Sequence, residues 1–583
     1  MSEPAKGSAA KALEFAIVVL CAGLSLFNLY QAVFGIWEAY LTRALHLIWA
    51  LVLIFLVYPL RLNTRRKWLN TACRAGDFLL TSVSASIGLY IMTYYHELEM
   101  RAGDPTTPDI ILGLILIVLV LEATRRTLGL SLVVVSVVLL IYTIYGRMFP
   151  GPFIHSGFSL AEIVDLNFLS TEGIFGVPLG AVVVYIFVFI IFATFLAESG
   201  VSDFFRDFSS ALLGHTRGGA AKVAVISSAF MGSITGSAAA NVMTTGAFTI
   251  PAMKRLGYTA VQAASIEAAA STGGQIMPPI MAAAGFILAS YIGVPYIQVA
   301  AAAVIPSLLY FFSVGVSVHL LSTRHAIMGM PRDQLPKLRS VLRRRGILTA
   351  PIFIVVWFLY YGHSPMKAGF YGILATIVAS FFSKETRIGL VKGFWALEKS
   401  GRVILQLIAT CACAGLIVSA IIMSGLGMKM PWLIRLFAGD NLLLSAALAG
   451  LGALILGMGM TTTAAYVIAA TLLAPSLTHL GMSVLGAHLF LLYFAIINNV
   501  TPPVAIASYA AASLAESDLW KTAIRAFRLA IAGFIIPFFF LFDESLLLQG
   551  SVWSIAHSLV TSILGVISLS IGVEGYLFEE IPA

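Results

Sequence analysis

Charged residues are scarce in this chain. Only 11% of its 583 residues are Asp, Glu, Lys or Arg, and 59% are hydrophobic, whereas about a quarter of an average soluble domain is charged. So few charges cannot cover a water-exposed surface, which excludes an ordinary soluble protein. The longest polar stretches, near 61–76 and 323–345, are also too short to form a second, soluble domain.

Groups that could support catalysis, metal binding or nucleotide hydrolysis are equally few. The four cysteines include Cys411 and Cys413 within one apolar run, without histidine or further cysteine beside them, so packing is their expected role. The ten histidines form no His-x-x-x-His or His/carboxylate cluster, and no Gly-x-x-x-x-Gly-Lys-Ser/Thr loop occurs. No nucleophile and base pair stands out either. We therefore expect no enzymatic activity.

What the chain does contain is apolar runs of about 20 residues, the length that crosses a ~30 Å hydrocarbon core. They predict an all-α polytopic membrane protein. The first run follows Lys6 and Lys11 without a small-residue cleavage site, so we expect it to be retained. Full spans are expected near 13–34, 44–60, 77–95, 110–124, 127–146, 173–197, 260–291, 298–322, 346–361, 366–382, 402–424, 486–513, 526–542 and 552–573.

The net charge of +8 reports orientation rather than a nucleic-acid partner, because Lys and Arg form short clusters between apolar runs. All clusters fall on one side if the N-terminus is cytoplasmic, so a bacterial inner-membrane location with that orientation is expected. The clustered bases are Lys6, Lys11, Arg61, Arg65, Arg66, Lys67, Arg74, Arg125, Arg126, Arg206, Arg217, Lys222, Arg324, Arg332, Lys337, Arg339, Arg343, Arg344, Arg345, Lys384, Arg387, Lys392 and Lys399.

Two apolar stretches, 219–253 and 442–474, are too long and too interrupted for one simple helix. The first has basic residues on both flanks and should begin and end on the cytoplasmic side. The second follows the eleventh full span and lies on the opposite side. Both are expected to be re-entrant hairpins, since non-helical backbone at membrane depth needs protein or a water-filled site around it.

A fixed offset relates these two regions. Pro-Pro occurs twice, at Pro278–Pro279 and Pro502–Pro503, 224 residues apart. The same offset carries Pro251 to Pro475, Leu256–Gly257 to Leu480–Gly481, and Ser237 to Thr461. Thus GSITGSAAANVMTTGAFTIPAMKRLG pairs with GMGMTTTAAYVIAATLLAPSLTHLG. Five spans separate the hairpins, so the copies have opposite topology, and such inverted repeats indicate a transporter with its site near the midplane.

Each Pro-Pro removes two backbone donors, so the helix that precedes it must open. Opening frees carbonyls at about 272–276 and 497–500, and Gly273 and Gly274 permit the turn. The hairpin tips add the hydroxyls and amide of Ser233, Thr235, Ser237, Asn241, Thr461, Thr462 and Thr463. Neutral oxygens without carboxylates suit Na⁺ rather than Ca²⁺ or Mg²⁺, and helix N-termini at the breaks suit an organic anion. The alternative is that Ser, Thr and Gly merely allow close helix packing.

Glu267 lies on the helix that leads into the first break. An intramembrane acid is a functional candidate. Here it could pair with Lys254, Arg255 or the hairpin backbone, and a structural role is favoured over proton transfer.

The run GSAAANVMTTGAFTIPAMKRLGY, followed by STGGQIMPPIMAAAGF, resembles the permease of tripartite ATP-independent periplasmic (TRAP) transporters. The chain is most similar to fused 4TM/12TM permeases that work with a TAXI-type periplasmic binding protein. This resemblance implies an inverted-repeat fold with two re-entrant hairpins and two broken helices. It also implies a Na⁺-driven elevator that imports a small carboxylate delivered by that binding protein.

The resemblance further implies two Na⁺ sites, one at each hairpin tip and break. Their expected residues are Ser237, Asn241, Gly273, Ile276 and Pro278 in the first, and Thr461, Thr462, Asn498, Thr501 and Pro502 in the second. Substrate is expected at Ser233, Gly236, Gly274, Gln275, Thr463 and Asn499. The second tip has Thr and Tyr466 where the first has Ala and Asn, so the sites need not be equal.

The expected domain organisation follows from these features. Residues 1–126 would form a four-helix scaffold like the small subunit, and 127–172 a connecting helix and a periplasmic loop, residues 147–172, that could dock the binding protein. The first inverted repeat would be 173–365, followed by a connecting segment, 366–401, and the second repeat, 402–583. A stand-alone Na⁺- or H⁺-coupled symporter or antiporter stays open as an alternative. The substrate is not readable from the sequence, because no Arg lies obviously at the breaks.

Overall fold

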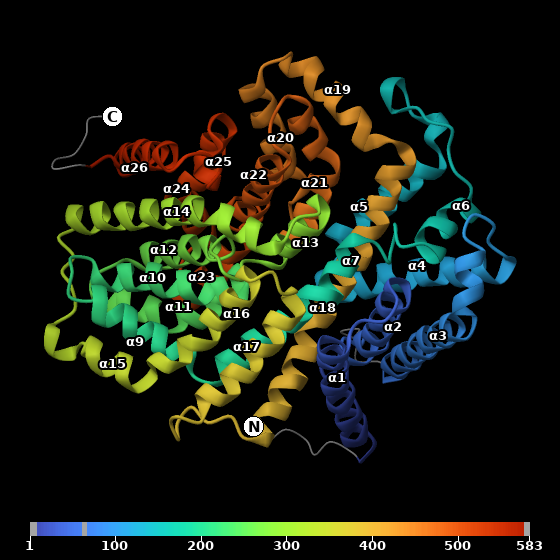
Figure 1. Ribbon diagram of the computed structural model, residues 1–583, viewed down its shortest axis with the longest axis horizontal. Helices are drawn as coiled ribbons and strands as arrows, with labels where there is room; N and C mark the ends of the chain where they lie inside the picture. The colour runs from blue at the N-terminus through green and yellow to red at the C-terminus, as the bar shows by residue number, and fades with distance from the viewer. Residues whose placement is uncertain (1–7, 61–66, 577–583) are drawn as a thin grey trace. The chain divides into compact units, whose positions relative to one another are not determined.

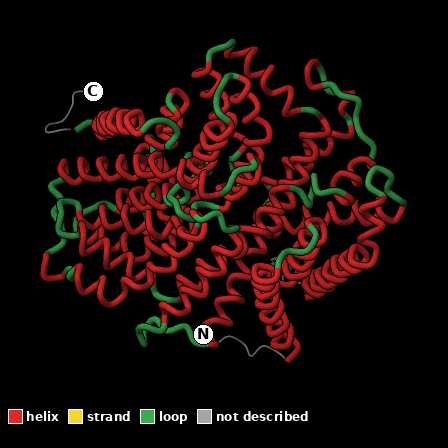
Figure 2. The backbone as a smooth tube through the Cα atoms, viewed as in Figure 1, coloured by secondary structure: helices red, strands yellow, loops and turns green. Residues whose placement is uncertain are grey.

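The computed structural model describes residues 8–60 and 67–576, and within these ranges all secondary-structure elements are helices (Figure 2). Lys6, Arg61, Arg65 and Arg66, which were used to predict orientation, lie outside the described residues. Nine helices of the described part are long and apolar enough to cross a membrane. The all-helical membrane fold that the composition predicts is therefore confirmed.

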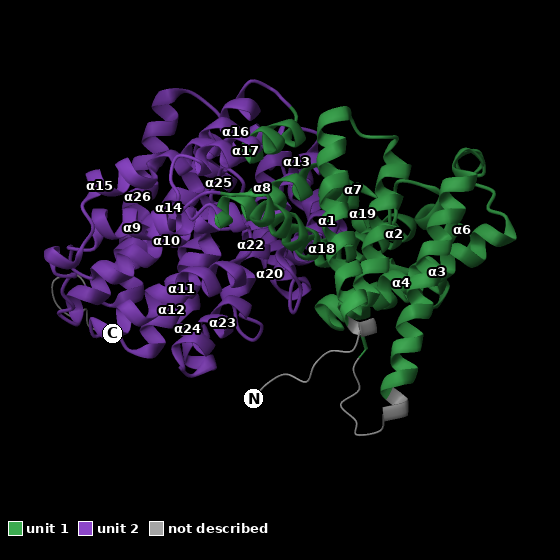
Figure 3. Ribbon diagram, turned by 90° about the horizontal axis from the view of Figure 1, so that it is seen from below, with its two compact units in different colours: residues 1–198, 364–373, 388–429 green, residues 199–363, 374–387, 430–583 purple. Residues whose placement is uncertain are grey.

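The chain divides into two compact units, coloured in Figure 3. The first unit comprises residues 1–198, 364–373 and 388–429. Its helices, labelled in Figure 1, are α1 (Ser8–Phe34), α2 (Ala39–Val57), α3 (Lys67–Met100), α4 (Thr107–Leu128), α5 (Ser131–Ile144), α6 (Leu160–Val164), α7 (Val177–Ala181), α8 (Phe187–Glu198) and α18 (Leu390–Ser424). Helix α18 is central, because α1, α2, α4, α5, α7 and α8 all pack against it.

Residues 199–363, 374–387 and 430–583 form the second unit. It contains α9 (Val201–Leu213), α10 (Gly219–Thr235), α11 (Ala238–Arg255), α12 (Ala260–Gly273), α13 (Ala283–Ile292), α14 (Tyr296–Arg324), α15 (Leu338–Arg345), α16 (Ala350–Tyr360), α20 (Leu442–Leu456), α21 (Thr462–His479), α22 (Val484–Ile497), α23 (Ile506–Ala515), α24 (Leu519–Leu529), α25 (Ala532–Phe542) and α26 (Val552–Glu574). Helices α17 (Pro365–Ser380) and α19 (Leu426–Ala438) contribute to both units. All sequence-predicted site residues belong to the second unit.

The 224-residue repeat reappears in the local structure of the second unit. The bounds of α11 and α12 map residue for residue onto those of α21 and α22. The hydroxyl of Ser237 caps α11 by accepting a bond from the Ala240 amide, and Thr461 caps α21 through Ala464 in the same way. Even the positive backbone angle φ recurs, with 61° at Met281 and 35° at Ala505. The repeat is thus one of conformation as well as of sequence.

Several expected spans differ at their ends. Helix α18 begins at Leu390 rather than near 402, because it continues through a polar first segment that hydropathy alone does not register. The span expected at 526–542 is part of a longer helical segment that starts with the amphipathic α24. The loop expected at 147–172 contains short helical turns, and Tyr142 Oη holds it by donating to the Phe153 carbonyl at 2.7 Å.

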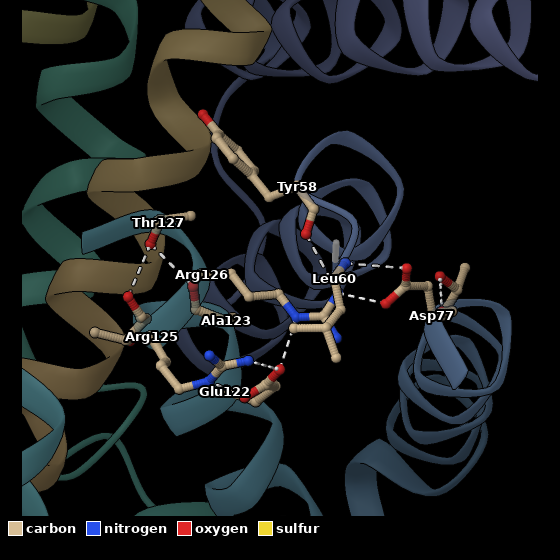
Figure 4. Close-up of polar contacts among 10 residues, drawn as sticks. Tyr58, Leu60, Asp77, Glu122, Ala123, Arg125, Arg126 and Thr127 are labelled. Carbon is tan, nitrogen blue, oxygen red and sulfur yellow. Dashed lines mark hydrogen bonds and ion pairs between the residues drawn. The ribbon is translucent and has the colours of Figure 1, made fainter. Parts of the chain in front are cut away.

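A buried ionic cluster fastens α2, α3 and α4 to one another in the first unit (Figure 4). Arg126 Nη1 lies 2.6 Å from Asp77 Oδ1, and each side chain is only 6% exposed. Asp77 also accepts a bond from the Leu60 amide at 3.2 Å, and Arg126 donates to the Tyr58 carbonyl at 3.3 Å. Glu122 Oε1 accepts a hydrogen bond from Nε of the same guanidinium at 2.7 Å. The end of α2 is therefore held against both following helices.

Replacing Asp77→Asn is expected to lower the free energy of unfolding by about 2 kcal/mol, because it weakens buried charge-assisted hydrogen bonds. The matched control is Glu97→Gln on the same helix, whose i,i+4 partner is Arg101 and whose side chain is 60% exposed. An exposed pair of this kind is worth about 0.5 kcal/mol or less. Unfolding in mixed micelles measures both variants, and equal stability of the two would contradict the role assigned to Asp77.

Candidate functional site

The first hairpin, α10–α11, turns at Gly236, whose φ of +63° is the left-handed conformation that glycine adopts without a Cβ penalty. Its tip packs backbone to backbone against the start of the first break. A Cβ built on Gly274 would lie 2.5 Å from the Gly232 Cα and 3.0 Å from the Ser228 carbonyl oxygen. The tip and the break can approach this closely only because both positions are glycine.

Gly274→Ala is therefore expected to destabilise the hairpin–break contact by about 2 kcal/mol and to reduce transport. The control is Gly315→Ala in α14, where nothing lies within 4 Å of the added carbon. Thermal unfolding and uptake would be measured on both. If the Gly274 variant has the same unfolding temperature and uptake as the Gly315 variant, the close contact between tip and break is not required for stability or transport.

The first break runs between the end of α12 and the start of α13. Within it, the Ile276 amide donates to the Gly273 carbonyl at 3.0 Å, and the Ala282 amide donates to the Gln275 carbonyl at 2.9 Å. Tyr296 Oη donates to the carbonyls of residues 279 and 280. Among the described residues, the carbonyls of Ile276 and Pro278 accept no backbone hydrogen bond. These oxygens remain available for a ligand.

The second break, between α22 and α23, repeats this arrangement. The Thr501 amide donates to the Asn498 carbonyl at 3.2 Å, and Thr501 Oγ1 donates to the Ile497 carbonyl at 2.9 Å. In the described part of the chain, the carbonyls of Val500 and Pro502 accept no backbone hydrogen bond. These are the positions equivalent to Ile276 and Pro278. Each break therefore leaves the same two backbone oxygens without a partner.

Gln275 connects the two halves of this site. Its Oε1 accepts a bond from Asn499 Nδ2 at 3.1 Å and another from Thr462 Oγ1 at 3.2 Å. Its Nε2 donates to the carbonyl of Gly236, at the first hairpin tip, at 3.0 Å. Gln275 and Asn499 are 224 residues apart and hold equivalent positions in the two repeats. The structure thus brings together four of the predicted residues, two from each repeat.

Asn241, one turn into α11, is fully buried. Its Nδ2 donates to the Ser228 carbonyl at 2.9 Å and lies 3.2 Å from the position of a Cβ on Gly274. Its Oδ1 is buried and has no hydrogen-bond partner within the described residues. Buried polar atoms almost always have a partner, so this amide oxygen beside the first break is a candidate ligand-binding atom.

The remaining predicted residues have other surroundings. The Ser233 hydroxyl donates to the Phe230 carbonyl of its own helix at 2.8 Å. Gly273 faces α14, where a Cβ would lie 2.2 Å from the Tyr310 ring. Asn498 lies against Gly457 at the end of α20, and Thr463 is buried in α21.

The expectation that Glu267 pairs with Lys254, Arg255 or the hairpin backbone is wrong. Lys254 Nζ donates to the Ala515 carbonyl at 3.1 Å, and Arg255 Nε donates to the Pro251 carbonyl. Neither base forms an ion pair with Glu267, which accepts hydrogen bonds from hydroxyl groups instead. These donors, which sequence reasoning missed, are Ser228, Thr245, Thr249 and Ser271.

A signal for these donors is present in the sequence. Asn241, Thr245 and Thr249 recur every four residues and so lie on one face of α11. A second polar contact was missed as well: Tyr466 Oη and His488 Nδ1 are 2.8 Å apart inside the second repeat.

The fold contains two helical hairpins and two broken helices, and backbone oxygens without hydrogen-bond partners lie where they meet. This combination defines a polytopic membrane protein of the transporter class. A family model described as the tripartite ATP-independent periplasmic transporter, DctM component, matches residues 115–555. The chain belongs to this family, the large permeases of TRAP transporters, and is therefore a multi-pass transport protein rather than an enzyme.

Several curated proteins are similar to the chain. The C4-dicarboxylate TRAP transporter large permease protein DctM of Pseudomonas aeruginosa is 25% identical over 353 residues, which cover 58% of this chain and 78% of that protein. The same-named protein of Vibrio cholerae is 22% identical over 401 residues, 63% of this chain and 83% of that protein. The isethionate TRAP transporter permease protein DctMQ of Oleidesulfovibrio alaskensis is 25% identical over 350 residues, 57% of this chain and 52% of that protein.

Proposed function

We propose that this chain is a fused 4TM/12TM permease of the TAXI type, which imports a small organic anion by a Na⁺-driven elevator mechanism. A separate periplasmic binding protein would deliver the anion. The observation that carries the proposal is the meeting of both hairpin tips with both breaks around Gln275 and Asn499, in a chain of the TRAP permease family. The chain would lie in the bacterial inner membrane with its N-terminus in the cytoplasm.

The oxygens at the breaks fit Na⁺. At the first break the Ile276 and Pro278 carbonyls and Asn241 Oδ1 are without hydrogen-bond partners in the described part of the chain. Neutral oxygens of this kind suit a hard monovalent cation, and no group of three or more His, Cys, Asp or Glu among the described residues offers a divalent site. Bound Na⁺ would supply positive charge beside the substrate. Ser237 and Gly273 would complete the first site, and Thr461, Thr462, Asn498, Thr501 and Pro502 the second.

The substrate is proposed to be a small carboxylate or a related anion. Two relatives are named for C4-dicarboxylate and one for isethionate, and all of these solutes carry an anionic group. In this chain the polar side chains of Gln275 and Asn499 lie between the hairpin tips. Helices α11 and α21 begin at those tips and direct N–H groups to the same region. Ser233, Gly236, Gly274 and Thr463 are proposed to line the remainder of the substrate site.

Two further features support the proposed elevator mechanism and the proposed fusion of a small and a large membrane subunit. All proposed ligands lie in the second compact unit, so that unit could move as one body with its cargo. The family match begins at residue 115. The helices before it, α1 to α3, agree with a small-subunit-like scaffold over 1–126, and the segment 147–172 would contribute to docking of the binding protein.

Reconstitution tests the proposed function. The purified chain is placed in proteoliposomes, and uptake of a labelled anion is measured under an inward Na⁺ gradient, with and without binding proteins encoded beside the gene. Uptake is expected only when Na⁺ and one loaded binding protein are both present. Robust uptake by the permease alone would overturn the proposal and favour a stand-alone symporter or antiporter.

A further inference from the structure

Glu267 is a fully buried carboxylate near the centre of the first repeat. Its Oε1 accepts bonds from Ser228 Oγ at 2.9 Å, from Ser271 Oγ at 3.1 Å and from Thr245 Oγ1, and its Oε2 accepts one from Thr249 Oγ1 at 2.5 Å. The donors come from three helices, α10, α11 and α12. No Lys, Arg or His of the described residues forms an ion pair with it.

Four hydroxyl groups surround the two oxygens of this carboxyl group. Each hydroxyl has one proton to donate. Thr245 Oγ1 and Thr249 Oγ1 also lie within hydrogen-bond distance of a backbone carbonyl, that of Asn241 at 2.8 Å and that of Thr245 at 3.0 Å. A buried charge is costly unless it is paired, and the described protein provides no fixed cation. When this carboxylate is ionised, its partner must therefore be a mobile cation.

The second repeat shows that the hairpin and broken helix fold without this cluster. The residues that correspond to the six polar ones, Glu267, Ser228, Thr245, Thr249, Ser271 and Asn241, are all apolar. They are Leu491, Ala453, Ala469, Leu473, Ala495 and Ala465, where Ala453 is matched through Gly457, which lies against Asn498 as Gly232 lies against Gly274. Both copies nevertheless form matching helices after the hairpin tip, α11 and α12 in the first and α21 and α22 in the second, and Ser237 and Thr461 cap α11 and α21 in the same way. A hairpin and broken helix of this kind can therefore fold without the carboxylate. The carboxylate is present only in the first repeat, which also contains Asn241.

Ser228 links Glu267 to the first break. Its carbonyl accepts a bond from Asn241 Nδ2 at 2.9 Å, while its own hydroxyl donates to Glu267. Thr245 forms a second link, because it follows Asn241 by one turn of α11 and contacts both Asn241 and Glu267. The carboxylate is thus two hydrogen bonds away from the amide whose Oδ1 has no partner among the described residues.

We propose that Glu267 is the counter-charge of a monovalent cation held at Asn241 and the first break, and that it makes this site tighter than the one in the second repeat. Glu267 acts as a positioning residue, because it stabilises the cation through its charge and fixes the Asn241 amide through Ser228. This inference rests on the proposed function, which places Na⁺ at the first break. The second repeat holds its cation with neutral oxygens alone.

Glu267→Gln tests the inference, because it removes the charge and keeps the shape. Purified full-length protein is titrated with NaCl against choline chloride at constant ionic strength, and the rise in unfolding temperature is followed. The midpoint Na⁺ concentration of the tighter phase is expected to increase about tenfold or more, as removal of a nearby charge in a low-dielectric site predicts. The maximal uptake rate at saturating Na⁺ should be largely retained. A purely structural role would not produce this combination.

A second variant gives the first repeat the residues of the second: Ser228→Ala, Thr245→Ala, Thr249→Leu, Glu267→Leu and Ser271→Ala together. It retains Asn241, should fold as the second repeat does, and should show the same increase in midpoint. The control Glu122→Gln makes an equal change of charge in the first unit and should leave the midpoint unchanged.

The outcomes separate the inference from the function on which it rests. If the wild-type protein is stabilised by Na⁺ but both Glu267 variants keep its midpoint, the counter-charge is refuted and the proposed function stands. Loss of uptake in Glu267→Gln at every Na⁺ concentration, with an unchanged midpoint, also refutes it. A wild-type protein that Na⁺ does not stabilise overturns both proposals.

Discussion

Replacing Pro278 and Pro279 together by alanine is expected to abolish transport while leaving membrane insertion intact. Two alanines restore two backbone donors and remove the rings that prevent α12 from continuing. A continuous helix would satisfy the Ile276 and Pro278 carbonyls internally and would remove the oxygens proposed to bind the cation. It would also displace Gln275, which connects the two hairpin tips. Uptake into proteoliposomes measures the loss, and yield from detergent extraction reports insertion.

Pro306→Ala is the matched control for this double variant. Pro306 lies inside α14, which already continues through it as a helix, so alanine should leave the course of the chain and the uptake rate nearly unchanged. Wild-type uptake by the Pro278/Pro279 variant would refute the broken-helix account. If the variant is not inserted, Pro502→Ala with Pro503→Ala offers the same test in the second repeat.

Asn241→Ala is expected to raise the Na⁺ concentration for half-maximal uptake by about tenfold or more. The variant removes an amide oxygen that is buried and has no partner within the described residues. Interactions with charged groups contribute about 1.5–3 kcal/mol, and about 1.4 kcal/mol corresponds to a factor of ten. The Na⁺ dependence of uptake, measured at saturating substrate and binding protein, checks the expectation.

Thr461→Ala provides the comparison in the second repeat, and its effect should be smaller. The Thr461 hydroxyl already accepts the bond that caps α21, and the other oxygens of the proposed site remain in place. Equal and unchanged Na⁺ dependence in both variants would refute the assignment of these residues as cation ligands. A larger effect at Thr461 than at Asn241 would contradict the inference, drawn from Glu267, that the first repeat binds Na⁺ more tightly than the second.

Much of the architecture could be predicted from the sequence, because it depends on local chemistry. Apolar length predicts the membrane helices, and Pro278–Pro279 and Pro502–Pro503 predict the two breaks. The constant offset predicts matching hairpins, and the structure repeats even their caps at Ser237 and Thr461. The opposite orientation of the copies and the re-entrant character of the hairpins stay predictions that rest on the distribution of basic residues.

The contacts of Glu267 could not be predicted because they depend on how three helices pack together. Sequence places Lys254 and Arg255 within a few turns of the carboxylate, which made an ion pair plausible. The structure instead places the hydroxyl-bearing face of α11 towards it, and both bases interact with backbone carbonyls. The hydrogen bond between Gln275 and Asn499 could not be predicted from the sequence either, because it requires the two repeats to meet at equivalent residues.

The two repeats share their backbone conformation but differ in their buried polar residues. The first has the buried carboxylate and Asn241, and the second has the Tyr466–His488 contact at positions where the first has Val242 and Ala264. A shared backbone design therefore supports two chemically different interiors. This difference predicts two Na⁺-binding phases of unequal affinity.

The influx of radioactive Na⁺ into proteoliposomes that contain the purified chain is the most direct test of Na⁺-coupled import. The account predicts that loaded binding protein accelerates Na⁺ influx, that unloaded binding protein does not, and that the Pro278/Pro279 variant shows no acceleration. Na⁺ influx that is the same with and without the loaded binding protein, while the anion still accumulates, would contradict it.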